Sequence, residues 1–281
     1  MTQCAEDWRA LRSHIQSTGS SAIVAFSGGV DSTLVLKAAQ EVLGDQIVAV
    51  TGLSPSLSPT EARKASDVAG ALGCRIRHAY TQEMENPAYV ANGDDRCYHC
   101  KTELYFHCQR IAEDEGYESI FDGTNADDAN DWRPGMTAAR EAGVRSPLLE
   151  TGLGKKQIRA LAKELGLPNW DKPALPCLAS RLPHGTSVTT ERLAAVDHVE
   201  SWLRSAGFRD VRARHFGEVV RIEVDSESIP RLLELTQQTA LQGVVQDAGF
   251  VRFEVDTDGF RSGKLTGAPT PPSQSPTKVS R

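Results

Sequence analysis

The 281-residue chain has no segment that would place it in a membrane or mark it for export. It contains no apolar run near the ~20 residues that span a bilayer, and its first residues are not a basic stretch followed by an apolar one. The net charge is −6, and no stretch interleaves basic with aromatic residues, which argues against a broad nucleic-acid surface. We therefore expect a cytoplasmic protein with neither a membrane nor a nucleic acid as partner.

The chain also lacks a recognisable disulfide or zinc framework. Six cysteines in a chain of this size, without an export signal, favour free, metal-bound or catalytic thiols over disulfides. Cys97 and Cys100 form the one C-x-x-C pair, and no second pair or H-x-x-x-H follows to complete a tetrahedral zinc site. The pair is then a redox centre or the corner of an iron–sulfur cluster. Cys177, between prolines and an arginine, is its candidate partner, the alternative being a core thiol.

A Walker-type phosphate loop is absent as well, because no Gly-Lys-Ser/Thr sequence occurs. Instead, an apolar strand at residues 23–26 runs into Ser-Gly-Gly-Val-Asp-Ser at 27–32 and then into a helix over 33–43. Backbone N–H groups at a helix N-terminus bind phosphate, and glycines let the backbone approach it closely. The residues that would act here are Ser27, Gly28, Gly29, Asp31 and Ser32, with Asp31 suited to hold Mg²⁺ between two phosphates. The alternative is an ordinary glycine turn.

Strands and helices alternate over the first two thirds of the chain. Strands are predicted at 23–26, 47–50, 75–78 and 119–122, and helices at 6–18, 33–43, 60–72 and 101–114. This order predicts a doubly wound parallel α/β sheet over 1–182, with ligands at the carboxyl ends of its strands. Helices at 190–206 and 229–239 and strands at 211–215, 219–224 and 250–255 predict a small α+β domain over 183–260. Residues 261–281, rich in Pro, Ser, Thr and Gly, predict a disordered tail.

A polar loop follows the fourth predicted strand and reads Asp-Gly-Thr-Asn-Ala-Asp-Asp at 122–128. By itself this is a good turn sequence. Together the two loops resemble the SGGxDS and GTNxDD motifs of the PP-loop ATP pyrophosphatase superfamily, whose members cleave ATP to AMP and pyrophosphate. The resemblance adds Gly123, Thr124, Asn125 and Asp127 to the ATP-binding residues. It also implies that basic positions of the helix beginning near Lys155 face the nucleotide, against a solvated face as the alternative.

A closer resemblance covers residues 8–258. It rests on SGGVDST, on RCYHCK at 96–101, on GTNADD and RPG within 123–135, on W-x-K-P and CLASR within 170–181, and on VRARHFGEVVRIEV at 211–224. These motifs resemble the LarE family of ATP-dependent sulfur transferases, which help build the nickel-pincer nucleotide cofactor of lactate racemase. The family adenylates a carboxylate of pyridinium-3,5-dicarboxylate mononucleotide, and the cysteine matching Cys177 attacks to leave a thiocarboxylate.

The resemblance implies several further features of this chain. Arg212 and Arg214 match positions that bind the substrate phosphate, the alternative being a solvated strand face. Arg181 has a similar case, because a guanidinium fork suits a carboxylate or a phosphate. It implies ATP and Mg²⁺ as cofactors, enzymes of the same cofactor pathway as partners, and a homo-oligomer, trimer or hexamer. Cys97 and Cys100 depart from the single-cysteine type, in which the cysteine is the sulfur source and ends as dehydroalanine. With Cys177 they would instead hold a [4Fe-4S] cluster with one open iron.

Other functions use the same motifs. A tRNA 2-thiolation enzyme pairs a pyrophosphate loop with C-x-x-C and a distant cysteine, although the acidic charge argues against it. An ammonia-dependent NAD synthetase-like ligase would need no thiol. A non-catalytic nucleotide sensor would bind ATP and release no pyrophosphate. The cofactor-building sulfur transferase, the tRNA 2-thiolation enzyme and the ligase share the logic of an acyl-adenylate, in which adenylation turns a poor leaving group into AMP.

Overall fold

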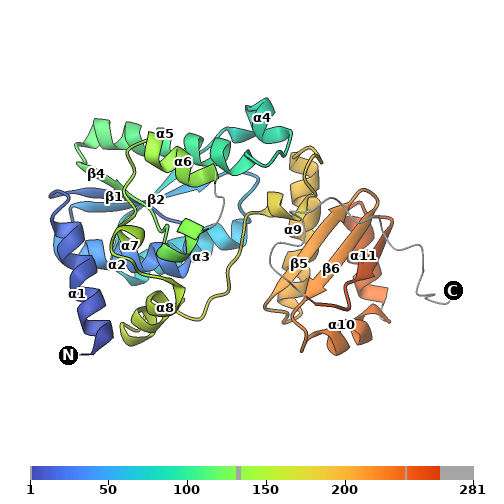
Figure 1. Ribbon diagram of the computed structural model, residues 1–281. Coiled ribbons are helices and arrows are strands. Elements are labelled where there is room, and N and C mark those ends of the chain that lie inside the picture. Colours follow the sequence, from blue (N-terminus) through green and yellow to red (C-terminus); the bar gives the residue numbers. More distant parts are fainter. Residues whose placement is uncertain (1, 131–133, 238, 260–281) are drawn as a thin grey trace.

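The computed structural model describes residues 2–130, 134–237 and 239–259. Two lobes, each built on its own sheet, are joined by an extended segment that follows α8 and leads to α9 (Figure 1). No helix in the described ranges is both long and apolar enough to cross a membrane. The tail predicted over 261–281 lies outside the described residues.

The larger lobe is organised by a four-stranded parallel sheet in the order β3-β2-β1-β4. Its strands are β1 (Ala22–Ala25), β2 (Ile47–Leu53), β3 (Ile76–Tyr80) and β4 (Ser119–Phe121). β1 is buried throughout, as is the first part of β2, because helices cover both faces. The prediction of a doubly wound α/β sheet is confirmed.

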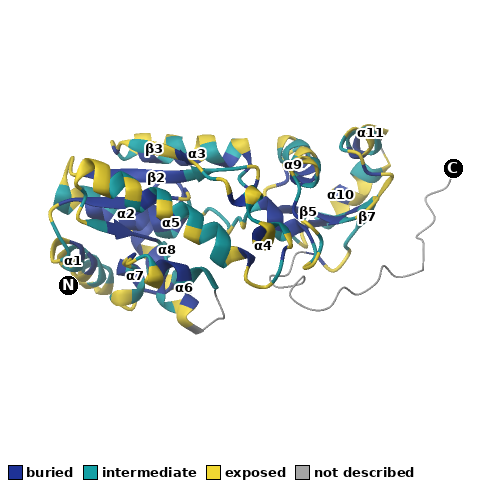
Figure 2. Cartoon of the chain, turned by 90° about the horizontal axis from the view of Figure 1, so that it is seen from above, coloured by how far each residue is buried: buried dark blue, intermediate teal, exposed yellow. Residues whose placement is uncertain are grey.

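Eight α-helices of the larger lobe lie within the described residues: α1 (Gln3–Gln16), α2 (Val30–Leu43), α3 (Pro59–Ala71), α4 (Pro87–Val90), α5 (Arg96–Glu115), α6 (Pro134–Glu141), α7 (Pro147–Glu150) and α8 (Lys155–Glu164). Short 3₁₀ turns are η1 (Glu83–Glu85) and η2 (Ala126–Asn130). Alternate residues of β1 separate two cores. Val24 packs with α1, α2, α3 and α8, whereas Ile23 packs with α5 and α6. Figure 2 shows the buried strands between these helical layers.

The smaller lobe contains a three-stranded sheet in the order β5-β6-β7. β5 (Val211–Phe216) and β6 (Val219–Val224) are antiparallel, and β7 (Arg252–Val255) is parallel to β6. The 3₁₀ turn η3 (Leu178–Arg181) leads to α9 (Thr190–Ser205), and α10 (Ile229–Thr236) and α11 (Thr239–Asp247) follow β6. The core of this lobe also takes in Tyr89 and the segment from Leu178 to Leu182, so the two lobes share apolar packing next to Cys177.

Two predicted helices differ from those observed. The helix predicted over 229–239 ends at Thr236 as α10, where the polar run Thr-Gln-Gln-Thr at 236–239 offers no apolar side chain to bury, and α11 over 239–247 was not predicted. The helix predicted over 101–114 begins earlier, at Arg96, so it contains both Cys97 and Cys100. Arg96 is buried, and its Nη1 donates to the carbonyl of Ala179 (3.0 Å). This long-range anchor of the first turn leaves no local signal in the sequence.

Candidate active site

The Ser27–Ser32 loop connects β1 to α2 at the carboxyl edge of the sheet. Gly28 has φ +66°, and a Cβ there would lie 2.8 Å from Cα of Ala65 on α3, so only glycine fits. The hydroxyls of Ser32 and Thr33 donate to the carbonyl of Gly29 (3.2 and 2.8 Å), which fixes the turn. Ser27 remains exposed, and the N-terminus of α2 has no side-chain cap. The loop is therefore shaped to receive an anion.

Asp31, in the first turn of α2, forms an ion pair with Lys155 at the start of α8. Burial raises the pKa of Asp31 against the opposing effect of Lys155. Its Oδ1 is buried without a hydrogen-bond partner in the described part of the chain. An orphaned carboxylate oxygen beside a phosphate loop is the kind of ligand that Mg²⁺ takes, so the residues fit that ion.

The loop after β4 lies directly against the start of α2. A Cβ on Gly123 would be 2.8 Å from the backbone nitrogen of Ser32, which explains the need for glycine. Asp122 organises the loop, because its carboxylate accepts hydrogen bonds from Thr124, from the Tyr105 hydroxyl (3.0 Å) and from the hydroxyl of Ser146 (2.8 Å). The structure thus brings the two predicted loops together, as the sequence led us to expect.

Asn125 and Asp127 are held by the protein itself. Asn125 is fully buried and donates through its backbone and side-chain nitrogens to Asp128 (3.1 and 2.8 Å). Asp127 accepts from the backbone nitrogen of Lys155 (2.7 Å), and so positions the N-terminus of α8. Their contacts place Lys155 next to Asp31, which is a positioning role in addition to the predicted contact with ATP.

Two residues that the sequence reasoning gave no role bind the phosphate loop from the interlobe segment. The side-chain amide of Asn169 donates to the carbonyl of Gly28 (3.1 Å) and to Thr33 Oγ1 (2.9 Å). Lys172 Nζ donates to the same carbonyl (3.0 Å) and pairs with Glu61 (2.9 Å). Lys172 lies within the W-x-K-P motif, the only signal that could have marked it. The phosphate loop is therefore connected to the segment that carries Cys177.

Cys177 follows this segment and is fastened to the larger sheet. The backbone nitrogen of the next residue, Leu178, donates to the carbonyl of Ser56, in the loop after β2 (2.9 Å). The hydroxyl of Ser56 in turn hydrogen-bonds that of Tyr89. Because β1 and β2 are parallel neighbours, Cys177 is anchored at the same sheet edge as the phosphate loop. This is where a nucleophile could meet an adenylated substrate.

The three predicted ligand cysteines influence one another. Cys177 and Cys100 contact the same apolar core, whereas Cys97 is exposed. Burial raises the pKa of the Cys100 thiol to about 12, and Cys177, Glu83 and Cys97 add to the shift. Glu83 is itself 2% exposed, and its Oε2 has no hydrogen-bond partner in the described ranges.

Arg96 and Lys101 are cations that interact with these thiols. Burial opposes the charge on Arg96, yet Cys177 and Cys97 raise its pKa overall. As they stand, no three His, Cys, Asp or Glu side chains among the described residues are placed to hold a metal ion. The thiols thus influence one another electrostatically without forming an assembled set of ligands.

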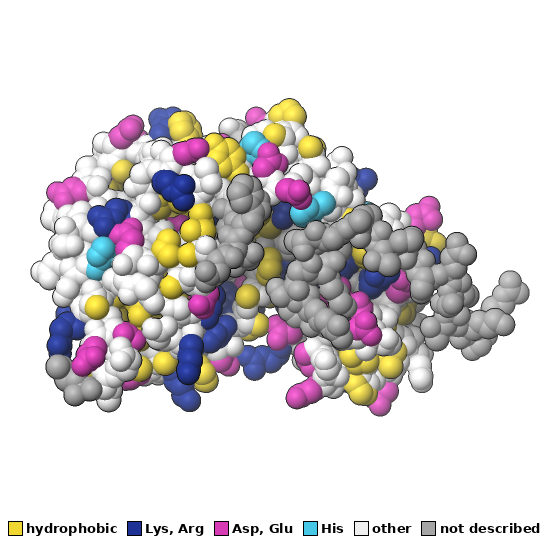
Figure 3. Space-filling model, viewed as in Figure 1, with side chains coloured by type: hydrophobic (Ala, Val, Ile, Leu, Met, Phe, Trp, Pro, Cys, Tyr) yellow, Lys and Arg dark blue, Asp and Glu magenta, His cyan; other side chains and the backbone are white. Residues whose placement is uncertain are grey.

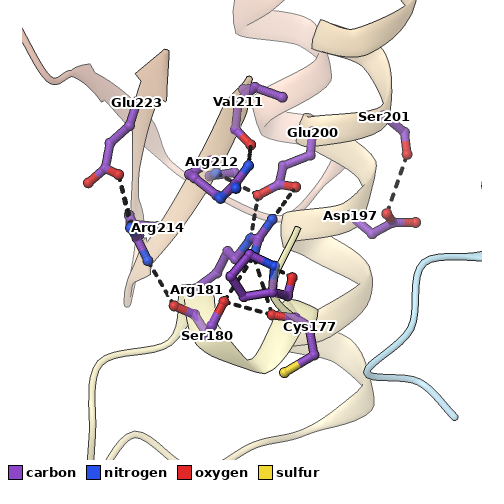
Figure 4. Close-up of polar contacts among 12 residues, drawn as sticks. Cys177, Ser180, Arg181, Asp197, Glu200, Ser201, Val211, Arg212, Arg214 and Glu223 are labelled. Atoms are coloured by element: carbon purple, nitrogen blue, oxygen red, sulfur yellow. Dashed lines mark hydrogen bonds and ion pairs between the residues drawn. The ribbon is translucent and has the colours of Figure 1, made fainter. Parts of the chain in front are cut away.

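Three arginines surround the Cys177 segment, and all are buried (Figure 4). Arg181 makes a two-pronged contact with Glu200 of α9 (2.7 and 3.0 Å). Arg212 donates to the carbonyls of Val211 and Ala174 (2.8 and 2.7 Å). Both side chains donate to acceptors inside the protein, and the burial of Arg212 excludes the alternative of a solvated strand face for it.

Arg214 follows the same pattern on β5. It contacts Glu223 through Nε and Nη2 (3.1 and 3.0 Å) and donates to the carbonyl of Ser180 through Nη1 (2.8 Å). β5 is buried at five of its six residues, in place of the half-exposed alternation that the sequence suggested. Positive charge nevertheless accumulates here: burial, then Arg181, lower the pKa of Arg212 to about 10. Buried cations beside Cys177 would favour an anionic ligand.

Known proteins share this arrangement of motifs to different extents. A family model described as NAD synthase matches residues 4–94. A protein of Synechocystis sp., described only as uncharacterised, is 45% identical over 244 residues, which is 87% of this chain and 91% of the relative. The pyridinium-3,5-bisthiocarboxylic acid mononucleotide synthase of Lactiplantibacillus plantarum is 40% identical over 86% of this chain and 87% of the relative. An uncharacterised protein of Methanocaldococcus jannaschii is 25% identical over 85% of this chain and 90% of the relative.

The parallel sheet, the SGGVDS loop and the adjoining GTNADD loop define an ATP-using enzyme of the PP-loop class. The NAD synthase model covers only the part that such enzymes share, whereas the relative from L. plantarum spans both lobes. The chain belongs to the LarE family of ATP-dependent sulfur transferases.

Proposed function

We propose that the protein adenylates a carboxylate of pyridinium-3,5-dicarboxylate mononucleotide and converts it to a thiocarboxylate. The observation that supports this most is the position of Cys177, whose neighbour Leu178 is hydrogen-bonded to the loop after β2, beside the phosphate loop after β1. A ligase using ammonia would need no thiol at this edge. The L. plantarum relative is named for a thiocarboxylate product of this kind, pyridinium-3,5-bisthiocarboxylic acid mononucleotide, which supports the proposal.

The reaction divides into two steps on the chain's own residues. In the first, a substrate carboxylate oxygen attacks the α-phosphorus of ATP, and pyrophosphate leaves with stabilisation by the N–H groups of the Ser27–Ser32 loop. Asp31 would hold Mg²⁺, which neutralises charge on the phosphates, and Lys155 would then be released from Asp31 toward them. In the second step, sulfur attacks the acyl carbon, the carbon–oxygen bond to AMP breaks, and AMP carries away the electron pair.

The sulfur source is where Cys97 and Cys100 enter. In the sacrificial scheme Cys177 forms a thioester, and removal of its α-proton breaks the Cβ–S bond to leave dehydroalanine and the thiocarboxylate. We propose instead that Cys97, Cys100 and Cys177 hold a [4Fe-4S] cluster. The donor set fits in kind, because thiolates are the ligands of such a cluster, Cys97 and Cys100 lie at the start of α5, and Cys100 and Cys177 pack against the same apolar core. The cluster would supply sulfide for repeated turnover.

For Arg181, Arg212 and Arg214 we propose that they create a positive field for the substrate's anionic groups. Each also positions the chain around Cys177, since Arg181 Nη1 donates to the carbonyl of Pro176 (2.8 Å) and Arg214 donates to that of Ser180. Substrate phosphate would compete with these internal contacts. Assembly into a homo-oligomer and cooperation with enzymes of the same cofactor pathway complete the proposal.

The proposal is tested by following adenylation and sulfur transfer separately. Wild-type protein, prepared without oxygen, is given ATP, Mg²⁺ and the pyridinium dicarboxylate, and AMP, pyrophosphate and thiocarboxylate are measured. Cys177→Ala should still release pyrophosphate in a single turnover but form no thiocarboxylate. Formation of ADP and phosphate, or full product formation by Cys177→Ala, would contradict the assignment.

Intact mass spectrometry then distinguishes the two sulfur sources. If a cluster is the sulfur donor, the protein's mass should be unchanged after turnover, because Cys177 remains a cysteine. The Cys97→Ser variant should then contain less iron and sulfide than wild type and should not turn over repeatedly. The control is Cys108→Ser, which changes a buried thiol that packs in the core between the larger sheet, α5 and α6. Conversion of Cys177 to dehydroalanine in protein free of iron would instead establish the sacrificial route.

A further inference from the structure

A cavity lies between the lobes, and Cys177 is not among the residues that line it. It measures about 460 Å³ and is bordered by α3, by the interlobe segment from 168 to 175, and by the chain from 204 to 209 at the end of α9. Its walls therefore come from both lobes and from the segment that joins them. This volume falls within the range that encloses a small-molecule ligand.

Cationic side chains dominate the polar part of this cavity. Four line it, against two carboxylates among its described residues, Asp67 and Asp171, and the cations are Lys64, Lys172, Arg204 and Arg209. In Figure 3 Lys and Arg side chains gather at the hollow between the lobes. The chain as a whole carries a net charge of −6, so this concentration is opposite to the protein's general character. A local concentration of positive charge on a chain with a negative net charge indicates an anionic ligand.

Two of the carboxylates that pair with these cations are each shared by two cations, whereas Arg209 pairs with Asp171 (3.2 Å). Glu61 pairs with both Lys64 (3.0 Å) and Lys172 (2.9 Å). Glu200 pairs with Arg204 and also with Arg181 (2.7 Å), so one negative charge again serves two cations. Nε and Nη1 of Arg204 are buried and have no hydrogen-bond partner within the described ranges. An unpaired guanidinium donor is costly, and an incoming anion would relieve that cost.

The remaining wall is apolar. Val68 on α3 faces the cavity together with Pro173 and Leu175 of the interlobe segment, and Phe208 closes it. Cations along one side and an apolar surface along the other match a molecule with a phosphate at one end and a planar ring at the other. Inorganic phosphate would contact only the cationic side.

We propose that this interlobe cavity binds a phosphorylated mononucleotide, in addition to the molecules bound at the phosphate loop and at Cys177. Its phosphate lies among Lys64, Arg204 and Arg209, and its ring lies against Pro173 and Leu175. Lys172 connects the ligand in this cavity to the phosphate loop, because Lys172 lines the cavity and its Nζ also donates to the carbonyl of Gly28. Binding in the cavity therefore links the two lobes and reaches the phosphate loop.

The test uses nicotinamide mononucleotide as the probe, with the phosphate loop filled by a non-hydrolysable ATP analogue and Mg²⁺. Acetylation of lysines is followed residue by residue by mass spectrometry, with and without the probe. We expect saturable protection of Lys64 and none of the exposed Lys156, which does not line the cavity. Binding is measured in parallel by calorimetry on wild-type protein and variants.

Matched charge reversals locate the site. Arg209→Glu should weaken the protection of Lys64 by the probe at least tenfold, because it replaces an attractive charge with a repulsive one. Arg209 is 73% exposed, so the variant is expected to fold. The control is Arg63→Glu, which makes the same change at an exposed position of α3 outside the cavity and should bind as wild type.

Three results would overturn the proposal. They are no protection of Lys64, equal weakening by Arg63→Glu, and protection by inorganic phosphate at the same concentration as the mononucleotide. The last would remove the ring from the proposed ligand. Because the footprint requires no turnover, failure here is distinguishable from failure of the sulfur-transfer assay.

Discussion

The phosphate loop and the arginine cluster near Cys177 are both suited to anions, but they are built in opposite ways. The loop offers backbone N–H groups and an exposed Ser27, and its glycines keep side chains away. The cluster consists of Arg181, Arg212 and Arg214, each less than a tenth exposed and bound to the chain's own acceptors. The loop is thus open for a ligand, whereas the arginines carry internal structure together with positive charge.

This difference teaches that residue type alone does not separate a ligand-binding arginine from a structural one. A glycine at φ +66° with no room for a Cβ has one geometric interpretation. A guanidinium has five donors and can satisfy the protein and a substrate at once. Substitutions that remove charge without changing shape are the way to tell these roles apart.

The largest effect is expected from Glu200→Gln, which removes the carboxylate shared by Arg181 and Arg204. Glu200 is fully buried, and its loss leaves two guanidinium groups without their counter-charge. Breaking a buried ion pair on one side typically costs about 3–5 kcal/mol. Thermal unfolding should show a correspondingly large fall in Tm. Glu254→Gln, at a partly exposed pair with Arg221, is the control and should change stability by less than about 1 kcal/mol.

The same pair predicts a pH dependence. Burial would raise the pKa of Glu200, but Arg181, more than any other group, holds it below the usual value. A carboxyl whose folded-state pKa is lowered stabilises the protein above its unfolded pKa, near 4.3, and loses that contribution as pH falls through the folded pKa. The Tm difference between wild type and Glu200→Gln should therefore narrow below about pH 4.3. A constant difference down to pH 3 would show that the charge is not its source.

Asp31→Asn is expected to have the next largest effect, and on catalysis rather than folding. The change keeps the size of the side chain but removes the charge that would hold Mg²⁺ and that now pairs with Lys155. Losing one such electrostatic contact in the transition state costs about 10²–10³ in kcat. Pyrophosphate release at increasing Mg²⁺ measures it. An unchanged rate with an unchanged Mg²⁺ dependence would remove Asp31 from the site.

How much the sequence could predict follows the same division. Strand, SGGVDS loop and helix are contiguous, so the phosphate site and the parallel sheet around it were both predicted. Asn169 and Lys172 were given no role because they contact Gly28 across 141 and 144 residues of sequence. The early start of α5 was missed for a similar reason, as Arg96 is anchored on Ala179, 83 residues away. A sequence pattern predicts the geometry of neighbouring residues. The contacts of Asn169, Lys172 and Arg96 were missed because they depend on how distant segments of the chain pack together.

Arg212→Ala and Arg214→Ala test whether the buried arginines also contact substrate. If each provides a charge-assisted phosphate contact, binding of the phosphorylated substrate should weaken by about 1.5–3 kcal/mol while ATP binding stays nearly intact. Calorimetry with each ligand in turn measures both. Arg221→Ala on β6, where Arg221 lies over the ring of Phe216, is the control for loss of an arginine from the same sheet. Equal loss of both affinities would indicate a purely structural role.

The smallest effect is expected from deleting residues 261–281. Their composition, rich in Pro, Ser, Thr and Gly, cannot bury enough apolar surface to offset the entropy of ordering the chain. Tm and the rate of pyrophosphate release should both match the full chain, with stability changed by no more than about 0.5 kcal/mol. The matched contrast is a truncation after Ala248, which also removes β7 and its parallel pairing with β6 and should unfold the smaller lobe. If the shorter deletion alone lowers Tm or abolishes activity, the tail takes part in the fold or the site.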